Sequence, residues 1–167
     1  MKYYIILLLL VSGLANAQNR SRVERLSNKV DVFVTKEIKE INTITIVSDN
    51  DPIGVASHMN RELLKHGIKT LSESAVRQRL LDITKIVEDN TTTISVDGAT
   101  KFLKSDVVLK VSYGANSLSS VSMSDLTIEI IDLSNEGQVI GSSYLKGNRI
   151  VKVAAPAVIL ATLKKIK

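Results

Sequence analysis

The chain has 167 residues, of which 44% are hydrophobic and 23% charged, and its formal net charge is +5. It contains no cysteine, which excludes disulfide bonds and a lipid anchor attached through cysteine. Only 4% of the residues are aromatic, so a surface for stacking nucleic-acid bases is not expected despite the positive charge.

Residues 1–17 are typical of a secretory signal peptide. A basic start precedes the apolar run 3–11, and residues 15–17 have the A-x-A form that signal peptidase cuts. The run is shorter than the roughly 20 residues that span a bilayer. We therefore expect a chain that starts at Gln18, is periplasmic or secreted, and has neither a lipobox cysteine nor a transmembrane segment.

Residues 18–40 have the weakest pattern. The stretch RSRVERLSNKVDVF is compatible with a short helix, whereas KVDVFV alternates like a strand. We expect a weakly structured N-terminal arm over 18–40 and a single α/β domain over 41–167.

The domain is expected to begin with a strand and an amphipathic helix. Residues 41–47 are rich in β-branched side chains and become apolar on both faces, which predicts a strand covered on both sides. Residues 48–52 follow, and most of them are of types that favour turns and helix N-caps. Apolar residues then recur at helical spacing until Gly67 ends the helix: Val55, Ala56, Met59, Leu63 and Leu64.

A second unit of the same kind follows. Residues 68–71 predict a short strand, and Ser72 can cap a helix whose inner face is Val76, Leu80 and Ile83. Residues 89–95 read as a loop. Asp97 can cap a brief helix that contains Phe102 and Leu103.

Three strands are predicted next, at 107–113, 126–133 and 138–145, with a serine-rich connection at 116–124. Val107, Leu109, Val111 and Tyr113 share one face of the first, and Leu126, Ile128 and Ile130 share one face of the second. The turn containing Asn135 and Gly137 is too short for a crossover, so the last two strands must be antiparallel.

The last predicted element is a helix over 154–163. It is apolar nearly all round, which indicates burial against the sheet. Pro156 is expected in its first turn, and Lys164, Lys165 and Lys167 lie favourably at its C-terminal end.

These elements predict an α/β fold with three layers. Right-handed crossovers place the second and third strands on either side of the first. The expected architecture is a five-stranded mixed sheet of order 2-1-3-4-5, with strand 4 antiparallel and helices on both faces.

The order of the motifs resembles a known family. They are a helix ending at Gly67, the segment 72–74 after a short strand, Asp106 before an apolar strand, and a hairpin from Asp132 to Gly137. Over about residues 41–163 this is similar to the α/β domain shared by CsgG, FlgO and the N-terminal domain of TolB.

The resemblance implies a periplasmic module that serves assembly and protein contact at the cell envelope. CsgG-like channels also have a lipidated cysteine and membrane-spanning hairpins. This chain has no cysteine, and its connection 116–124 is too short and polar for such a hairpin. The channel activity is therefore not carried over.

Residues that would carry chemistry are sparse. No Cys or G-x-S-x-G is present, and the only histidines, His58 and His66, lie two helical turns apart, too far to share one ion. Asp49-x-Asp51 lacks the ligands that a calcium loop needs at its later positions. We expect no catalytic residues, no metal and no cofactor.

One ligand site is predicted from topology. In a sheet of this order, a crevice opens at the carboxyl ends of strands 1 and 3. The residues expected to line it are Asp49, Asn50, Asp51, Gly114 and Asn116. The simpler interpretation of the aspartates is that they cap the following helix.

The sequence thus predicts an exported, non-enzymatic envelope protein that acts through contact with an envelope protein, at an exposed sheet edge or through the N-terminal arm. The alternative is a small-molecule or ion-binding periplasmic module that uses the crevice. A hydrolase would need a convergent site that the sequence does not contain. A homo-oligomer is left open.

Overall fold

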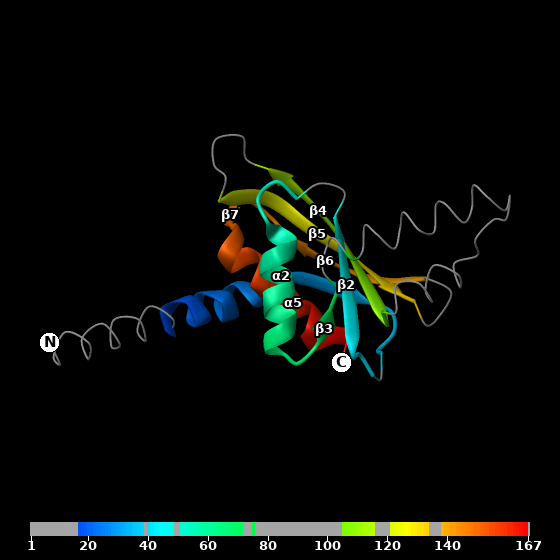
Figure 1. Cartoon of the computed structure of the whole chain (residues 1–167). Coiled ribbons are helices and arrows are strands. Elements are labelled where there is room, and N and C mark those ends of the chain that lie inside the picture. Colours follow the sequence, from blue (N-terminus) through cyan, green and yellow to red (C-terminus); the bar gives the residue numbers. More distant parts are fainter. Residues whose placement is uncertain are drawn as a thin grey trace, which may run out of the picture.

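The computed structural model describes residues 17–38, 40–48, 51–71, 75, 105–115, 121–133 and 138–166. In these residues a mixed sheet packs against helices (Figure 1). The strands follow the order β1-β6-β5-β4-β2-β3, and β7 pairs with β5 outside this path.

The parallel part of the sheet is centred on β2 (Thr43–Ser48). It lies between β3 (Lys69–Thr70) and β4 (Val107–Ala115) and runs parallel to both. Ile44 and Ile46 face the helices, and Thr45 on the opposite face is also fully buried. The expectation of a strand covered on both sides is confirmed.

The antiparallel part consists of β4, β5 (Ser122–Asp132) and β6 (Gln138–Leu145). The predicted inward faces of 107–113 and 126–133 are confirmed by burial. However, β5 begins inside the segment expected to be a connection. It does so because Ser122 and Met123 pair with β7 (Arg149–Ile150).

The number of strands predicted from the sequence is wrong. The five expected strands do occur in the order 2-1-3-4-5, with only β5 reversed among them, but β1 (Asp31–Val34) and β7 enlarge the sheet. The segment expected to be a weakly structured arm contains a helix over residues 17–27 and then β1. β1 forms because it pairs with β6, which is distant in the sequence.

The first helix of the domain, α2 (Val55–Lys65), ends as expected at Gly67. Gly67 has φ 74, and the N–H groups of Gly67 and Ile68 donate to the carbonyls of Leu64 and Leu63, which is a Schellman motif. Leu64 was expected on the inner face but is 59% exposed, because Glu62 takes the inner position next to Leu63.

The closing helix, α5 (Val151–Ile166), is longer than predicted and is buried nearly all round. Pro156 therefore lies beyond the first turn, contrary to expectation, and has no N–H to offer the carbonyl of Lys152. Two buried hydroxyl groups join this helix to the sheet: the oxygens of Ser143 and Thr162 are 2.7 Å apart.

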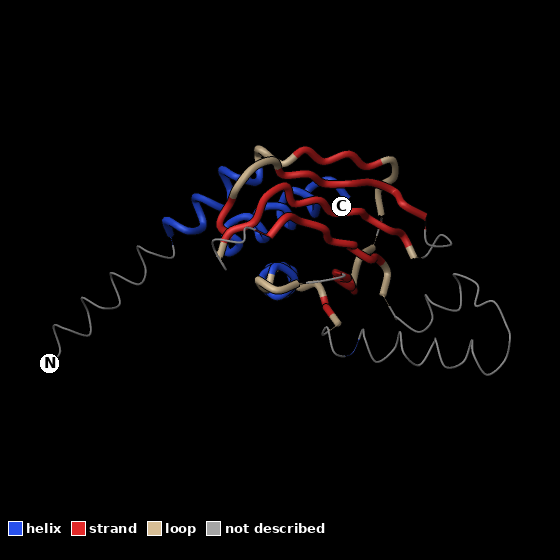
Figure 2. The backbone as a smooth tube through the Cα atoms, turned by 90° about the horizontal axis from the view of Figure 1, so that it is seen from above, coloured by secondary structure: helices blue, strands red, loops and turns tan. Residues whose placement is uncertain are grey.

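Both α2 and α5 pack side by side on the same face of the curved sheet (Figures 1 and 2). Their apolar side chains join the inward strand residues in one core. The signal segment 1–16, the predicted helix after Ser72, the loop 89–95, the brief helix after Asp97 and the turn 134–137 lie outside the described residues. The expected helical layer on the opposite face is thus not described.

No helix in the described part of the chain is both long and apolar enough to cross a membrane.

Candidate functional site

The predicted crevice contains an aspartate that caps α2. Asp51 follows β2 in the chain, and its two carboxylate oxygens accept the N–H groups of Val55 at 2.7 Å and Ala56 at 2.9 Å. These donors belong to the first turn of α2, where helical N–H groups have no partner within the helix. The N-cap residue of α2 is Gly54, which makes no side-chain bond, so Asp51 bonds the first turn from three residues before the N-cap.

Tyr113 of β4 contacts the same carboxylate. The hydroxyl group of Tyr113 donates to Oδ1 of Asp51 at 2.6 Å. Burial, and then this hydrogen bond, raise the pKa of Tyr113 well above its ordinary value. Sequence analysis placed Tyr113 at the end of an inward face but gave it no role at the site. Its position near the end of β4, on the same face as Val111, was the available signal.

Of the other predicted crevice residues, only Gly114 is described. It is exposed and pairs with Ser124 of β5. A side chain at this position would collide with the hydroxyl group of Ser124. Asp49, Asn50 and Asn116 lie outside the described residues, so the ligand site as a whole stays a prediction.

Asp106 and Asp132, the two aspartates in the motifs that resemble the CsgG family, both bond to residues near the ends of other strands. Oδ2 of Asp106 accepts the N–H groups of Asn42 at 2.8 Å and Thr43 at 2.9 Å, which joins the start of β2 to the start of β4. Asp132 is 1% exposed and is 3.1 Å from Nζ of Lys36, just beyond β1. Both carboxylates are bonded within the fold.

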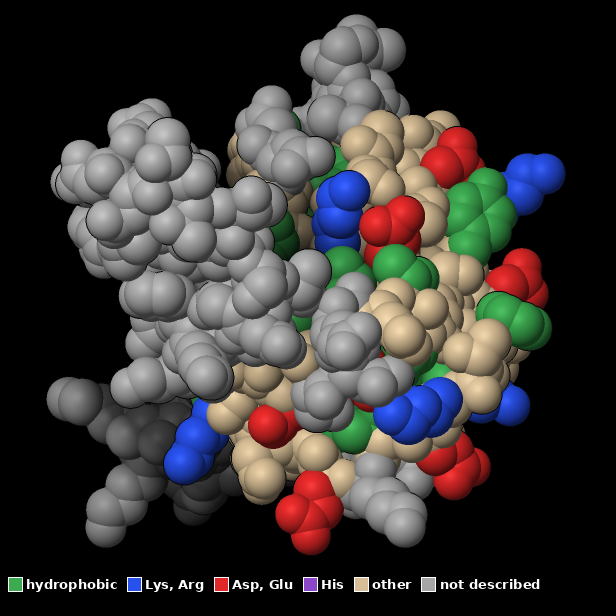
Figure 3. Space-filling model, turned by 90° about the vertical axis from the view of Figure 1, so that its right-hand side faces the viewer, with side chains coloured by type: hydrophobic (Ala, Val, Ile, Leu, Met, Phe, Trp, Pro, Cys, Tyr) green, Lys and Arg blue, Asp and Glu red, His purple; other side chains and the backbone are tan. Residues whose placement is uncertain are grey.

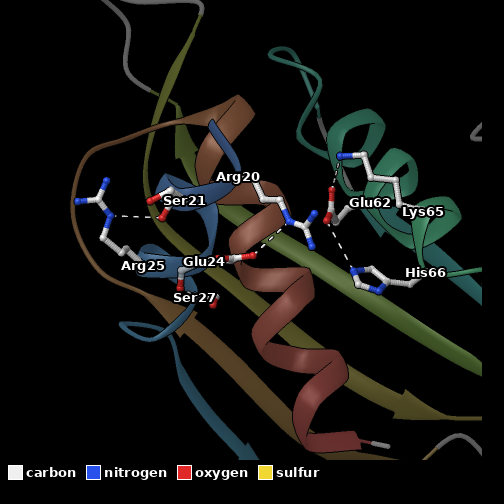
Figure 4. A network of polar contacts seen from close by, with 8 residues as sticks. All are labelled: Arg20, Ser21, Glu24, Arg25, Ser27, Glu62, Lys65 and His66. Carbon is white, nitrogen blue, oxygen red and sulfur yellow. Dashed lines mark hydrogen bonds and ion pairs between the residues drawn. The ribbon is translucent and has the colours of Figure 1, made fainter. Parts of the chain in front are cut away.

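The two histidines line a groove between the helix 17–27, α2 and α5, with a volume of about 740 Å³. Figure 4 shows Arg20 reaching from the helix 17–27 toward Glu62 and His66. Glu62 is 2.8 Å from Nζ of Lys65 and 3.6 Å from Nε2 of His66, and Arg20 pairs with Glu24 at 3.3 Å. The groove therefore contains both charges, and its two glutamates pair with residues of the same groove.

The pKa of His58 is lowered. Its burial, and then the neighbouring charge of Arg61, lower its pKa from the ordinary 6.5, and Lys152 acts in the same direction. Asp51 acts in the opposite direction, with an effect smaller than those of burial and Arg61 but larger than that of Lys152. No cluster of His, Asp and Glu within the described ranges is arranged to hold a metal ion.

Among the described residues, β1 is the last strand at one edge of the sheet. Within this part of the chain its one pairing is with β6, and the N–H of Thr35 just after it donates to the carbonyl of Ile140 at 2.8 Å. Because backbone direction alternates along a strand, the backbone groups of Val32 and Val34 face away from the sheet. The side chain of Phe33 is 68% exposed.

On the side drawn in Figure 3, acidic, basic and isolated hydrophobic side chains are interspersed, without an extended patch of one kind. Phe33 combined with a free strand edge is thus a local feature, which sequence analysis named only as an unspecified sheet edge.

No family model matches the chain, and no curated protein matches it. Among solved structures, a PelC dodecamer from Paraburkholderia phytofirmans is 11% identical, with 83% of this chain and 98% of that chain covered and a TM-score of 0.46. The C-terminal domain of LpoB from Salmonella enterica is 13% identical, with 68% and 85% covered and a TM-score of 0.44.

A third structure, the lipoprotein GNA1162 from Neisseria meningitidis, is 11% identical, with 64% of this chain and 81% of that chain covered and a TM-score of 0.38. None of these three is a CsgG, FlgO or TolB structure, so the specific family expected from the sequence is unconfirmed. At this similarity they assign no function to the chain.

Proposed function

We propose that this chain is an exported, non-enzymatic protein of the cell envelope that acts by contact with another protein at the free edge of β1. The observation that carries the proposal is the combination of outward backbone groups at Val32 and Val34 with a side chain of Phe33 that is 68% exposed. A strand edge of this kind accepts an extended segment of a partner as an additional strand.

The size of the edge defines the kind of contact. β1 has four residues, so a partner strand would gain only the few backbone hydrogen bonds that Val32 and Val34 offer. Burying the ring of Phe33 against the partner would add about 1.5–3 kcal/mol. Such a contact is reversible, which suits regulated assembly better than a permanent interface.

Export and the absence of catalysis rest on other residues. The signal-like segment 1–17 supports export to the periplasm or beyond. The engagement of Asp51 in capping and of Glu62 in ion pairs supports a non-enzymatic role, because these carboxylates are already bonded within the fold.

The test is photo-crosslinking in cells. A benzophenone-bearing aromatic residue replaces Phe33, whose exposed ring tolerates a larger substituent, and the envelope fraction is analysed after illumination. The matched control has the same residue at Leu64, which is 59% exposed on α2, away from the sheet edge.

The proposal predicts a discrete crosslinked product from position 33 and none from position 64. The mass of the product tells whether the partner is another protein or a second copy of the chain. Equal products from both positions, or none from position 33, would contradict contact at this edge.

A further inference from the structure

A second surface, distant in the sequence from β1, is built from basic residues. A cleft of about 660 Å³ opens between the helix 17–27, β7 and the start of α5. Its basic lining consists of Arg22, Arg25, Lys29 and Arg149. We define these residues and the space between them as the basic cleft.

The charges of the basic cleft are not balanced within the described part of the chain. None of its described lining residues is acidic, and none of its four cations makes an ion pair there. Nε of Arg25 donates to the carbonyl of Ser21 at 3.3 Å, and Nη1 of Arg149 donates to the carbonyl of Asn148 at 2.8 Å. Both guanidinium groups keep further N–H donors.

The histidine groove is a useful comparison. It lies on the other side of the same N-terminal helix and also contains four Arg and Lys residues. Two of them are paired with acidic lining residues: Arg20 with Glu24 and Lys65 with Glu62. Like charges gathered in a concave surface repel one another, and a bound anion relieves that repulsion. The basic cleft has no acidic lining residue, so its excess of positive charge is larger than that of the groove and favours a bound anion more strongly.

The backbone fixes the position of Arg149. Gly147 just before it has φ 84, a conformation favoured by glycine, and the N–H of Gly147 donates to Oδ1 of Asp125 at 3.0 Å. Asp125 itself has a positive φ, at the bulge where Tyr113 opposes two residues of β5. The turn before Arg149 is thus anchored to the sheet.

The rest of the lining consists of the polar residue Asn148 and three apolar residues. Leu26 and Val153 are partly buried, and Ile150 is 49% exposed beside Arg149. Arg side chains match the geometry of phosphate oxygens by forming paired hydrogen bonds. An apolar floor beneath three arginines and a lysine suits a phosphate that carries an apolar group.

We propose that the basic cleft binds the phosphate group of an organic ligand with an apolar part. This chemistry has two sources: the headgroup of an anionic phospholipid, or a soluble phosphate compound. The proposal is independent of the contact at β1, because the two surfaces share no residue.

The test measures binding of the purified chain in two arms. The first is sedimentation with vesicles of phosphatidylcholine containing phosphatidylglycerol, against vesicles of phosphatidylcholine alone. The second is calorimetric titration with pyrophosphate, which is also added as a competitor in the vesicle arm. Each arm compares the wild type with Arg22→Gln/Arg149→Gln.

The control variant is Lys164→Gln/Lys165→Gln, which removes the same charge from two exposed residues at the end of α5. A second cleft variant, Arg25→Gln/Lys29→Gln, covers the case in which the first is not folded by circular dichroism. A cleft variant should bind about tenfold more weakly or worse, whereas the control should stay within about twofold of wild type.

The vesicle arm and the pyrophosphate arm distinguish a lipid headgroup from a soluble phosphate. Binding to phosphatidylglycerol vesicles that is weakened in the cleft variants, with no binding of pyrophosphate, identifies a lipid headgroup. Binding of pyrophosphate that is weakened in the cleft variants identifies a soluble phosphate. The proposal is overturned if the wild type binds in neither arm, or if the control variant loses as much affinity as the cleft variants, because general charge attraction would then explain the binding.

Discussion

At the scale of single residues, the carboxylate of Asp51 connects three elements that are separate in the sequence. It follows β2, caps α2 and accepts the hydroxyl group of Tyr113 from β4. A residue with this many internal bonds is expected to affect stability first.

Replacing Asp51 tests the capping role. Asp51→Ala should lower the free energy of unfolding by about 1–2 kcal/mol, because two N–H groups of α2 and the hydroxyl group of Tyr113 lose their acceptor. Tyr113→Phe, which removes only the hydroxyl bond, should cost about 1 kcal/mol. Urea unfolding measures both. If Asp51→Ala is as stable as the wild type, these hydrogen bonds contribute little to stability, and the carboxylate is available for another role.

His58 should make stability depend on pH. Burial first, and then Arg61, lower its pKa in the folded chain below 6.5. The unfolded chain therefore takes up the proton at a higher pH than the folded chain does. The stability associated with neutral His58 is present above about pH 6.5 and is lost as the pH falls through the folded pKa.

The measurement is the unfolding midpoint of wild type and His58→Gln between pH 7.5 and pH 5. The wild type should lose more stability than the variant over this range, and His66→Gln serves as the matched control. Parallel curves for wild type and His58→Gln would show that His58 does not titrate abnormally.

At the scale of elements, α5 is joined to β6 by hydroxyl groups inside an otherwise apolar contact. The hydroxyl group of Thr162 donates to the carbonyl of Val158 at 2.8 Å, so its single proton is used there. Ser143 must then donate to Thr162 across 2.7 Å. Both side chains are fully buried.

A double-mutant cycle tests this junction. Ser143→Ala and Thr162→Val should each lower the free energy of unfolding by about 1–3 kcal/mol, since each disturbs a buried bond. The double variant should lose about 1 kcal/mol less than the sum of the two, because no hydroxyl group is then left unpaired. Strict additivity would argue against the bond.

The attachment of β1 depends on Gly141 of β6. A methyl group there would collide with the carbonyl oxygen of Phe33 and crowd Val34, both in the neighbouring strand. Gly141→Ala should therefore speed amide exchange at Thr35, whose N–H donates to Ile140. Ser142→Ala is the control. Unchanged exchange at Thr35 in Gly141→Ala would mean that β1 does not pack as described.

The elements that sequence analysis predicted well are those specified by local patterns. The strands 41–47, 107–113 and 138–145 alternate or are rich in β-branched residues, and Gly67 has the signal of a helix end. β1 lies in the stretch KVDVFV, whose alternation was noted but left undecided between helix and strand. Its four residues are half exposed, and the strand is stabilised by pairing with β6, about a hundred positions away. The pattern of residues within β1 does not indicate that it pairs with β6.

The candidate sites were also predicted only where they depend on residues that are close in the sequence. Asp51 was named from its place after a strand, but its bond to Tyr113 joins residues 62 positions apart. The basic cleft was missed for this reason: Arg22 and Arg149 lie near opposite ends of the chain, and along the sequence the positive charge looks evenly spread.

At the scale of the whole molecule, the covered face of the sheet and its open edge have different roles. α2 and α5 bury one face in a single core, and β1 has two backbone positions without a strand partner among the described residues at the end of the sheet. The proposed contact uses only that end, so it should be separable from folding.

Proline substitution at Val32 separates them most directly. Val32→Pro removes an N–H that faces away from β6 and so spares the ladder between β1 and β6, whereas Val32→Ala keeps the N–H and loses similar packing. Each is combined with the photoreactive residue at position 33. The account predicts that Val32→Pro abolishes the crosslinked product and Val32→Ala retains it; an undiminished product in the folded Val32→Pro variant would contradict strand addition at β1.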